Sequence, residues 1–195
     1  MLLFYLYIST ITLCLAASVY FKLARQRYLW VYFSGVLFFE FVQNYKLLPE
    51  VVYCYSSLFY ILFFLNLYQT QIRFNKIVIV FLNLVLLSTG IYFNLDSEHF
   101  SISLGILMSL IYISLTLIWF FGQLQNSDED PLFKKQFFWI SSALLIWSVF
   151  FIFRLIPMNY FNIHDHQFLQ TLNLIFQLIT IFTYILFLKA LSCKK

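Results

Sequence analysis

The feature that most constrains this chain is the stretch 28–48, YLWVYFSGVLFFEFVQNYKLL, which is apolar along its length yet contains Glu40. As an α-helix rising about 1.5 Å per residue, it would place Glu40 about 18 Å from its first residue, well inside a hydrocarbon layer of roughly 30 Å. A carboxylate at that depth is costly and indicates a functional site by default. Gln43 and Asn44, three and four residues further on, share its helix face. The stretch therefore predicts a membrane helix whose polar face is turned to protein or to a cavity.

The composition is that of a membrane protein. Of 195 residues, 63% are hydrophobic and 10% are charged, whereas about 25% of residues are charged in soluble domains. The longest clearly polar stretch, 123–136, is too short for a core of its own. We therefore expect a single transmembrane domain over 1–195, surrounded by the lipid bilayer. Any enzymatic or DNA-binding module would belong to another chain, and we expect no nucleic-acid partner.

Apolar runs of membrane-spanning length, about 17 to 25 residues, recur along the whole chain. They lie at 2–21, 28–48, 51–68, 77–93, 102–122, 137–156 and 168–188. The runs are continuous rather than alternating and exceed the roughly 10 residues of a barrel strand. Pro49 and Pro157 end the second and sixth runs, because proline cannot donate a helical hydrogen bond. The sequence thus predicts an all-α bundle of seven transmembrane helices, in which the second and third are antiparallel neighbours.

Small residues predict one close helix contact. Ser101, Gly105 and Ser109 recur at four-residue spacing in the fifth run. This pattern lets membrane helices approach closely. We interpret it as a packing face rather than a site.

The basic residues predict the orientation of the bundle. With the N-terminus outside, the inner segments hold most of the 12 lysines and arginines. These are Lys22, Arg25, Arg27, Arg73, Lys76, Lys134, Lys135, Lys189, Lys194 and Lys195. Lys46 and Arg154 fall toward the other side. Because cytoplasmic segments carry the excess of Lys and Arg, we expect a multi-pass membrane protein with an outside N-terminus and a cytoplasmic C-terminus.

The seventh run carries a polar stripe on one helix face. Its members are His166, Gln170, Asn173, Gln177, Thr180 and Tyr184. Unpaired amides in lipid cost several kcal/mol, so the stripe should face the bundle interior. It is either a set of interhelical hydrogen bonds, worth about 0.6 to 2 kcal/mol each, or one wall of a polar cavity.

Arg154 is the second intramembrane charge. It lies about 26 Å along the sixth helix from Phe137, where it could reach the outer boundary or turn inward to compensate Glu40. Such a pair would be either structural or part of a ligand or proton site. The full candidate ligand-binding set is Glu40, Gln43, Asn44, Tyr60, Arg154, Asn173 and Gln177.

Other chemistry is set aside on residue grounds. The outer loops hold metal-capable side chains, namely Asp96, Glu98, His99, His164, Asp165 and His166. Short wet loops commonly carry such residues, so we expect no metal and no cofactor. The sequence has no glycine-rich phosphate loop and no HExxH motif, and no lysine lies in 168–188 to attach retinal. Glu40 is the only base inside a span, so we expect no catalytic residues and no enzyme.

The run 131–153, PLFKKQFFWISSALLIWSVFFIF, together with the acid at position 40, resembles an uncharacterised group of small seven-helix proteins of Bacteroidota-type bacteria. The resemblance extends loosely over the whole length. The group tends to have glycine and tyrosine where this chain has Ala143 and Trp147. Genes of the group often lie beside two-component sensor genes, so the resemblance implies a sensory or signalling partner role.

Two functions stay open. The receptor-like topology, the one-sided internal polar face and the lack of an output domain predict a non-catalytic receptor-like sensor or accessory subunit. It would bind a small or lipidic ligand and signal to a separate cytoplasmic or membrane protein. The alternative is a small-solute or proton-coupled carrier with Glu40 as the coupling site, although carriers often break helices near the membrane midplane.

Overall fold

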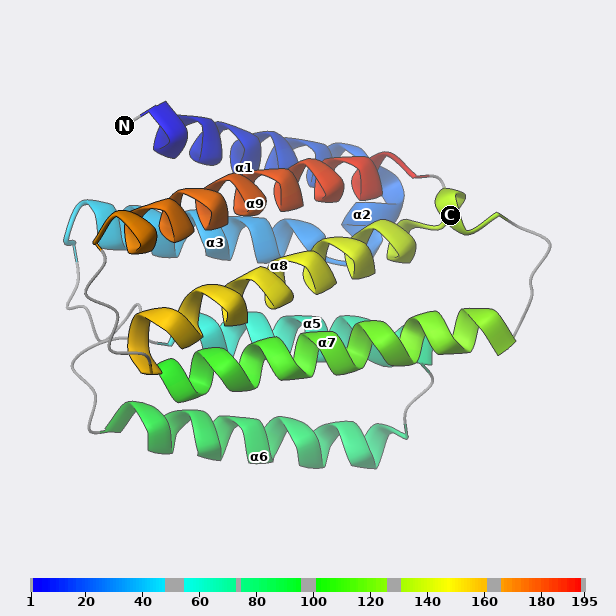
Figure 1. Ribbon diagram of the computed structural model, residues 1–195. Helices are drawn as coiled ribbons and strands as arrows, with labels where there is room; N and C mark the ends of the chain where they lie inside the picture. Colours follow the sequence, from blue (N-terminus) through cyan, green and yellow to red (C-terminus); the bar gives the residue numbers. More distant parts are fainter. Residues whose placement is uncertain are drawn as a thin grey trace. The chain divides into compact units, whose positions relative to one another are not determined.

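The computed structural model describes residues 2–47, 55–72, 75–95, 101–125, 131–160 and 166–193. This part of the chain contains seven long α-helices (Figure 1). They are α1 (Leu2–Tyr20), α3 (Leu29–Asn44), α5 (Ser56–Ile72), α6 (Lys76–Leu95), α7 (Ile102–Gln125), α8 (Gln136–Tyr160) and α9 (His166–Ser192). Two short helices accompany them, α2 (Lys22–Gln26) and the 3-10 helix η1 (Leu132–Lys134). Each predicted apolar run thus overlaps one of these long helices, and the all-α fold is confirmed.

Within the described ranges, five helices are long and apolar enough to cross a membrane. Their spans are Leu3–Tyr20, Lys76–Phe93, Ile102–Gln125, Gln136–Met158 and His166–Ser192. The described parts of α3 and α5 have 16 and 17 residues, which is about 24 to 26 Å of helix. Large apolar side chains are exposed on the long helices, for example Phe81 on α6 and Leu124 on α7. A membrane-embedded protein explains that surface, because lipid tails rather than water then surround it.

The chain folds as two compact units that do not correspond to its consecutive halves. Unit 1 consists of 1–30 and 127–195, and unit 2 consists of 31–126. The two ends of the chain therefore form one helical unit, and the middle forms the other.

In unit 1, α9 packs against both α1 and α8, and Figure 1 shows it between them. The rings of Tyr7 and Tyr184 meet edge to face with their centroids 5.6 Å apart. The Cys14 thiol donates a 3.4 Å hydrogen bond to the backbone carbonyl of Tyr184. Further along both helices, Ala17 and Leu188 line the same groove. Helices α1 and α9 therefore run parallel.

Helix α8 runs antiparallel to α9. Its Trp147 ring lies 5.9 Å from the ring of Phe176. Nearer the start of α8, the Lys189 ammonium lies 6.0 Å from the centre of the Trp139 ring. The last residues of α1 and α9 and the first residues of α8 thus lie on the same side of unit 1.

The end of α8 differs from the prediction. We expected the sixth helix to finish before Pro157, but α8 continues through this proline to Tyr160. Proline lacks the N–H that would bond the carbonyl of Phe153. A last helical turn can accommodate this loss, because terminal carbonyls have other ways to be satisfied.

In unit 2, α3 and α5 face each other through aromatic rings. Tyr32 stacks on Phe63 at 5.4 Å and meets Phe64 edge to face at 4.8 Å. At the other end of the contact, Phe39 lies 6.1 Å from Phe59. The two helices are therefore antiparallel neighbours, as predicted. Pro49, the predicted end of the second helix, lies outside the described residues.

Helix α7 packs against α5 with its small-residue face. Gly105 and Ser109 are buried, and the Ser109 hydroxyl donates a 3.1 Å hydrogen bond to the Gly105 carbonyl of its own helix. One turn on, the Tyr112 ring meets Phe64 of α5 at 5.3 Å. Tyr112 continues the helix face of Gly105 and Ser109, so the buried small residues and the ring contact with α5 lie on one side of α7.

A pair of asparagines joins α5 to α6. Asn66 Nδ2 donates to Asn83 Oδ1 at 3.2 Å, and Asn83 Nδ2 donates back to Asn66 Oδ1 at 3.3 Å. Asn66 Nδ2 also donates to the Leu62 carbonyl at 2.7 Å. Each asparagine lies in the middle of an apolar helix, so each amide provides the polar partner that lipid cannot give.

We expect Asn66→Leu and Asn83→Leu each to lower the stability of the purified protein, because each leaves the other amide facing apolar surroundings. The double variant removes both amides and should lose less than the sum of the two single losses. The coupling should be about 0.6 to 2 kcal/mol. Denaturation of the four proteins in one detergent measures it, and strictly additive losses would show that the pair contributes nothing.

Candidate functional site

An apolar pocket of about 150 Å³ lies between α8 and α9 in unit 1. Its lining residues are Phe150, Phe153, Phe168, Thr171, Leu172, Ile175 and Phe176. Dry apolar cavities of roughly this size accept benzene-sized ligands. The pocket therefore fits a small apolar group or the end of a hydrocarbon chain.

Helical spacing builds this pocket. Phe168, Leu172 and Phe176 recur at steps of four on α9 and so share one face. Phe150 and Phe153 lie one turn apart on the antiparallel helix α8. Six of the seven lining side chains are thus aromatic or aliphatic, two on α8 and four on α9, and Thr171 is the one lining residue with a hydroxyl. The Thr171 hydroxyl donates to the Gln167 carbonyl of its own helix at 2.8 Å, so it adds little polarity to the pocket.

Arg154 contacts one of the residues that line the pocket. Its guanidinium carbon is 4.8 Å from the centre of the Phe176 ring, and Phe176 lines the pocket. The Arg154 side chain is half-buried. A guanidinium over an aromatic face gains about 0.5 to 2 kcal/mol, and arginine keeps its charge at physiological pH. An apolar pocket with a cation against one of its lining rings suits a ligand with an apolar body and an anionic group.

Only part of the polar stripe of α9 makes the expected helix contacts inside unit 1. Tyr184 is buried against Tyr7 of α1, which agrees with a role in helix packing. Asn173 is half-buried, and Gln177 is exposed. His166 and Gln170, nearer the start of α9, are also exposed. The half of the stripe nearer the start of α9 is therefore left uncovered by α1 and α8.

The remaining predicted residues belong to unit 2. Tyr60 joins the aromatic contact between α3 and α5, with its ring 5.8 Å from Tyr32 and 6.0 Å from Phe39. Glu40 is half-buried beside Phe39. Gln43 and Asn44, one turn further along α3, are exposed.

The pairing of Glu40 with Arg154 stays a prediction, since the two residues belong to different units. The same holds for the candidate ligand-binding set that groups Tyr60 of unit 2 with Asn173 and Gln177 of unit 1. What the structure brings together is Arg154 with α9, and Tyr60 with α3.

No three His, Cys, Asp or Glu side chains come together in the described part of the chain. The loop residues considered as metal ligands, apart from His166, lie outside that part. They are Asp96, Glu98, His99, His164 and Asp165.

Sequence reasoning missed two features that the structure displays. The phenylalanines of the pocket gave no distinct signal, because the chain has 26 phenylalanines. The Asn66 and Asn83 pair did leave a signal. Asn66 lies about as far before the last residue of α5 as Asn83 lies after the first residue of α6. In an antiparallel hairpin of helices, such positions face each other.

Comparisons with known proteins add no further constraint. No family model matches the chain, no characterised protein is significantly similar to it, and no solved structure matches it. The resemblance based on 131–153 therefore stays a prediction, and the functional argument rests on the residues of this chain.

Proposed function

We propose that this protein is a non-catalytic, receptor-like membrane protein that senses a small lipidic ligand and signals to a separate protein. The observation that carries the proposal is the apolar pocket between α8 and α9, whose lining residue Phe176 is in contact with Arg154. A pocket lined mostly by aromatic and aliphatic side chains selects an apolar body. The cation beside it favours an acidic group, so a fatty-acid-like ligand fits best.

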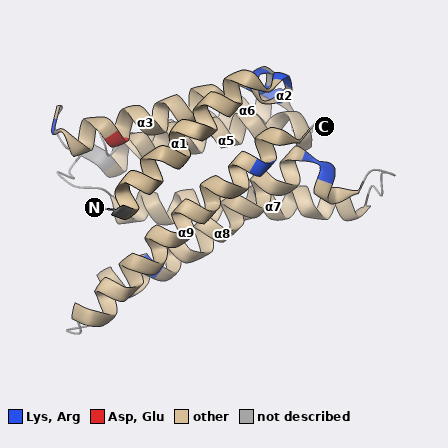
Figure 2. Ribbon diagram, turned by 90° about the horizontal axis from the view of Figure 1, so that it is seen from above, with Lys and Arg blue, Asp and Glu red and all other residues tan. Residues whose placement is uncertain are grey.

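The topology that goes with this proposal has seven spans, an outside N-terminus and a cytoplasmic C-terminus. In unit 1, the described basic residues other than Arg154 belong to the segments where α1 and α9 end and α8 begins (Figure 2). They are Lys22, Arg25, Arg27, Lys134, Lys135 and Lys189. By the positive-inside tendency, that end would face the cytoplasm. The α8–α9 pocket, further from that end, would then open toward the outer half of the membrane.

Location and partner follow from the same proposal. A bacterial inner membrane is the setting that the resemblance implies. A signalling partner, in the cytoplasm or in the membrane, would supply the output that the described helices do not themselves contain.

The continuous helices favour a sensor over a carrier. In the described ranges, no helix is interrupted near its middle, whereas carriers often have broken helices around a midplane site. The carrier hypothesis with Glu40 as the coupling site therefore remains the weaker one.

Ligand binding can be tested with octanoate and octanol, which share a chain length and differ in charge. We expect octanoate to raise the melting temperature of the purified protein more than octanol does, because Arg154 attracts the carboxylate. Arg154→Met should remove this preference and keep the response to octanol. Leu172→Trp should fill the pocket and abolish both responses.

Leu178→Trp is the matched control, because Leu178 is exposed on the same helix. It should leave both responses unchanged. Equal responses of wild type and Leu172→Trp would rule out the pocket as the ligand site.

The signalling half of the proposal needs a partner. Native mass spectrometry of the protein, gently extracted from its own membrane, should show a second polypeptide in fixed stoichiometry. A chain that is always alone, and that moves octanoate across proteoliposomes in a Glu40-dependent way, would favour a carrier instead.

A further inference from the structure

The amide pair between α5 and α6 has hydrogen-bonding capacity left over. An asparagine side chain has two N–H donors and an oxygen that can accept two hydrogen bonds. Both donors of Asn66 are used, one by the Leu62 carbonyl at 2.7 Å and one by Asn83 Oδ1 at 3.2 Å. Asn83 Nδ2 gives one donor to Asn66 Oδ1 at 3.3 Å. Its second donor has no acceptor within the described residues, and each amide oxygen accepts a single hydrogen bond there.

The unused donor of Asn83 lies inside the apolar span of α6. Asn83 comes seven residues after Lys76, the first residue of the span Lys76–Phe93, which is about 10 Å along the helix. The Asn66 side chain is exposed and that of Asn83 is half-buried. Hydrocarbon offers no acceptor to an N–H group, so leaving it without one is costly. The amide pair therefore needs a further polar group at this depth of the membrane.

Asn83 separates the buried side of α6 from an exposed one. With 3.6 residues per turn, Ile79 and Leu86 lie on one side of it, and both are buried. Val80 and Leu87 lie on its other side and are 59% and 38% exposed. An exposed apolar strip of α6 therefore runs directly beside the amide that has a donor to spare.

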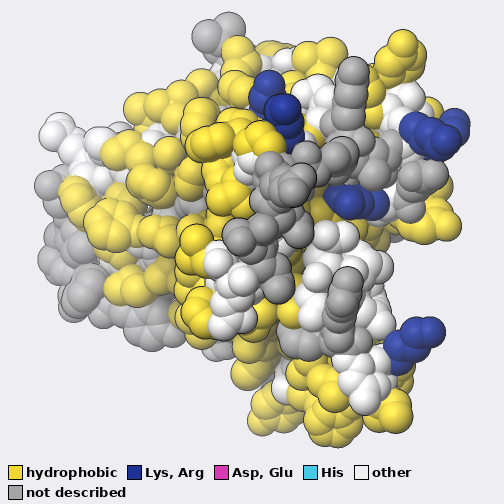
Figure 3. Space-filling view, turned by 90° about the vertical axis from the view of Figure 1, so that its right-hand side faces the viewer, with side chains coloured by type: hydrophobic (Ala, Val, Ile, Leu, Met, Phe, Trp, Pro, Cys, Tyr) yellow, Lys and Arg dark blue, Asp and Glu magenta, His cyan; other side chains and the backbone are white. Residues whose placement is uncertain are grey.

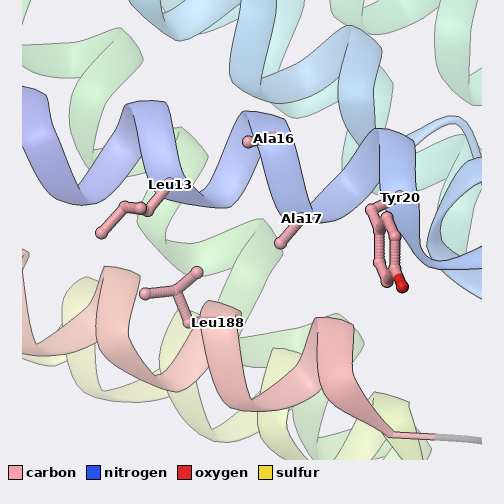
Figure 4. A pocket seen from close by; sticks show the side chains of 5 residues that line it. All are labelled: Leu13, Ala16, Ala17, Tyr20 and Leu188. Carbon is pink, nitrogen blue, oxygen red and sulfur yellow. The ribbon is translucent and has the colours of Figure 1, made fainter.

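Apolar surface alone does not select a partner in this protein. Hydrophobic side chains cover much of the face of the molecule that Figure 3 shows. The open groove between α1 and α9 in unit 1 is apolar as well, and Figure 4 shows its lining residues Leu13, Ala16, Ala17, Tyr20 and Leu188. Lipid tails are as apolar as such side chains and can cover them. The amide pair is different, because lipid tails cannot replace a directional hydrogen bond.

We propose that two copies of this chain associate in the membrane through α6, with the two Asn83 amides hydrogen-bonded to each other. Copies of a membrane protein share one orientation, so the twofold axis of such a dimer runs along the membrane normal. This axis places Asn83 at the same depth as Asn83 of the partner subunit. The unused N–H of each amide can then donate to Oδ1 of the other. Val80 and Leu87 would add apolar contacts around the two amides.

Self-complementarity favours a second copy over a different membrane protein. The partner must offer both an acceptor and a donor at the depth of Asn83. A second copy meets this condition by symmetry, because an amide carries both groups. A different helix would need its own polar side chain at the matching depth. The proposal concerns unit 2 and does not depend on the α8–α9 pocket, which lies in unit 1.

Energy transfer between donor- and acceptor-labelled full-length chains, tagged after Lys195 and mixed in liposomes, tests the proposal. We expect transfer in wild type that unlabelled wild type reduces by competition. Asn83→Leu should weaken dimerisation by about 10- to 1,000-fold, because it removes two hydrogen bonds worth about 3- to 30-fold each. Asn66→Leu should weaken it by less than about threefold, because Asn83 keeps its amide.

Two valines of α6 provide a matched pair of variants. Val80→Trp places bulk beside Asn83 and should weaken dimerisation by about tenfold or more. Val78→Trp is the same change on the same helix, and Val78 is also exposed, at 45%. Val78 lies about 160° around the helix from Val80, so Val78→Trp should dimerise as wild type does.

Three results would overturn the proposal. One is a wild type whose energy transfer does not respond to unlabelled chains, which would make the protein a monomer. Another is equal weakening by Asn66→Leu and Asn83→Leu, which would limit both amides to the contact of α5 with α6. The third is an equal effect of Val80→Trp and Val78→Trp. The two valine variants decide even if Asn83→Leu does not fold, because both valines are on the surface.

Discussion

Replacing Phe64 by alanine should lower the free energy of unfolding by about 2 to 4 kcal/mol, the largest effect we expect from a single change. The Phe64 ring is 0% exposed and links three helices of unit 2. It lies 4.8 Å from Tyr32 of α3 and 5.3 Å from Tyr112 of α7. Removing a buried ring leaves a cavity, and the cost in water-soluble cores is about 3 to 5 kcal/mol. The expected loss is somewhat smaller here, because lipid already surrounds apolar side chains in the unfolded reference state.

Phe81→Ala provides the control for this prediction. It removes the same atoms from α6 of the same unit, but the Phe81 side chain is 65% exposed. Its loss should stay within about 0.5 kcal/mol, as for surface positions in general. Denaturation followed by circular dichroism in one detergent compares the two variants with wild type. Similar losses for both would show that Phe64 does not hold α3, α5 and α7 together.

The helices were predictable because the membrane sets their length. A span needs about 20 apolar residues, and the predicted runs 102–122 and 168–188 fall inside α7 and α9. Helix ends were less predictable. Helix α8 passes through Pro157, since a proline in the last turn costs only a terminal hydrogen bond.

The grouping of helices into units was not predictable from the same signals. Helices such as α1 are apolar all around, so no amphipathic face shows which neighbour they choose. The contact of α1 with α9 depends on individual shapes, such as Tyr7 against Tyr184. Short connections, by contrast, do fix neighbours, and this is why the antiparallel pair α3 and α5 was foreseen.

The one part of the candidate site that the sequence pointed to is its charged residue. Arg154 was singled out because a guanidinium inside a span is rare, and the structure places it against Phe176 of α9. The pocket beside it arises where phenylalanines of α8 and α9 meet. Apolar side chains in an apolar chain carry no distinguishing pattern, so only the packed structure shows that pocket.

The second large effect is expected at Gly90, where α6 lies against Leu58 of α5. A Cβ added at Gly90 would lie 2.7 Å from Cγ and 2.8 Å from Cδ1 of Leu58. Because the branching carbon itself is crowded, turning the methyl groups alone cannot make room. The Leu58 side chain is buried, so either its rotamer or the separation of the helices must change. Such overpacking costs typically 1 to 3 kcal/mol, and we expect Gly90→Ala to be destabilising by that amount.

Two further variants show whether the cause is this contact. Gly122→Ala makes the same chemical change on α7, where an added Cβ meets nothing within 4 Å. It should be neutral or stabilising by up to about 1 kcal/mol, because alanine favours helix over glycine. Adding Leu58→Ala to Gly90→Ala frees the crowded space, so the double variant should be more stable than the sum of the single losses predicts. If the two losses of stability simply add, the contact with Leu58 is not the reason why a side chain at position 90 is destabilising.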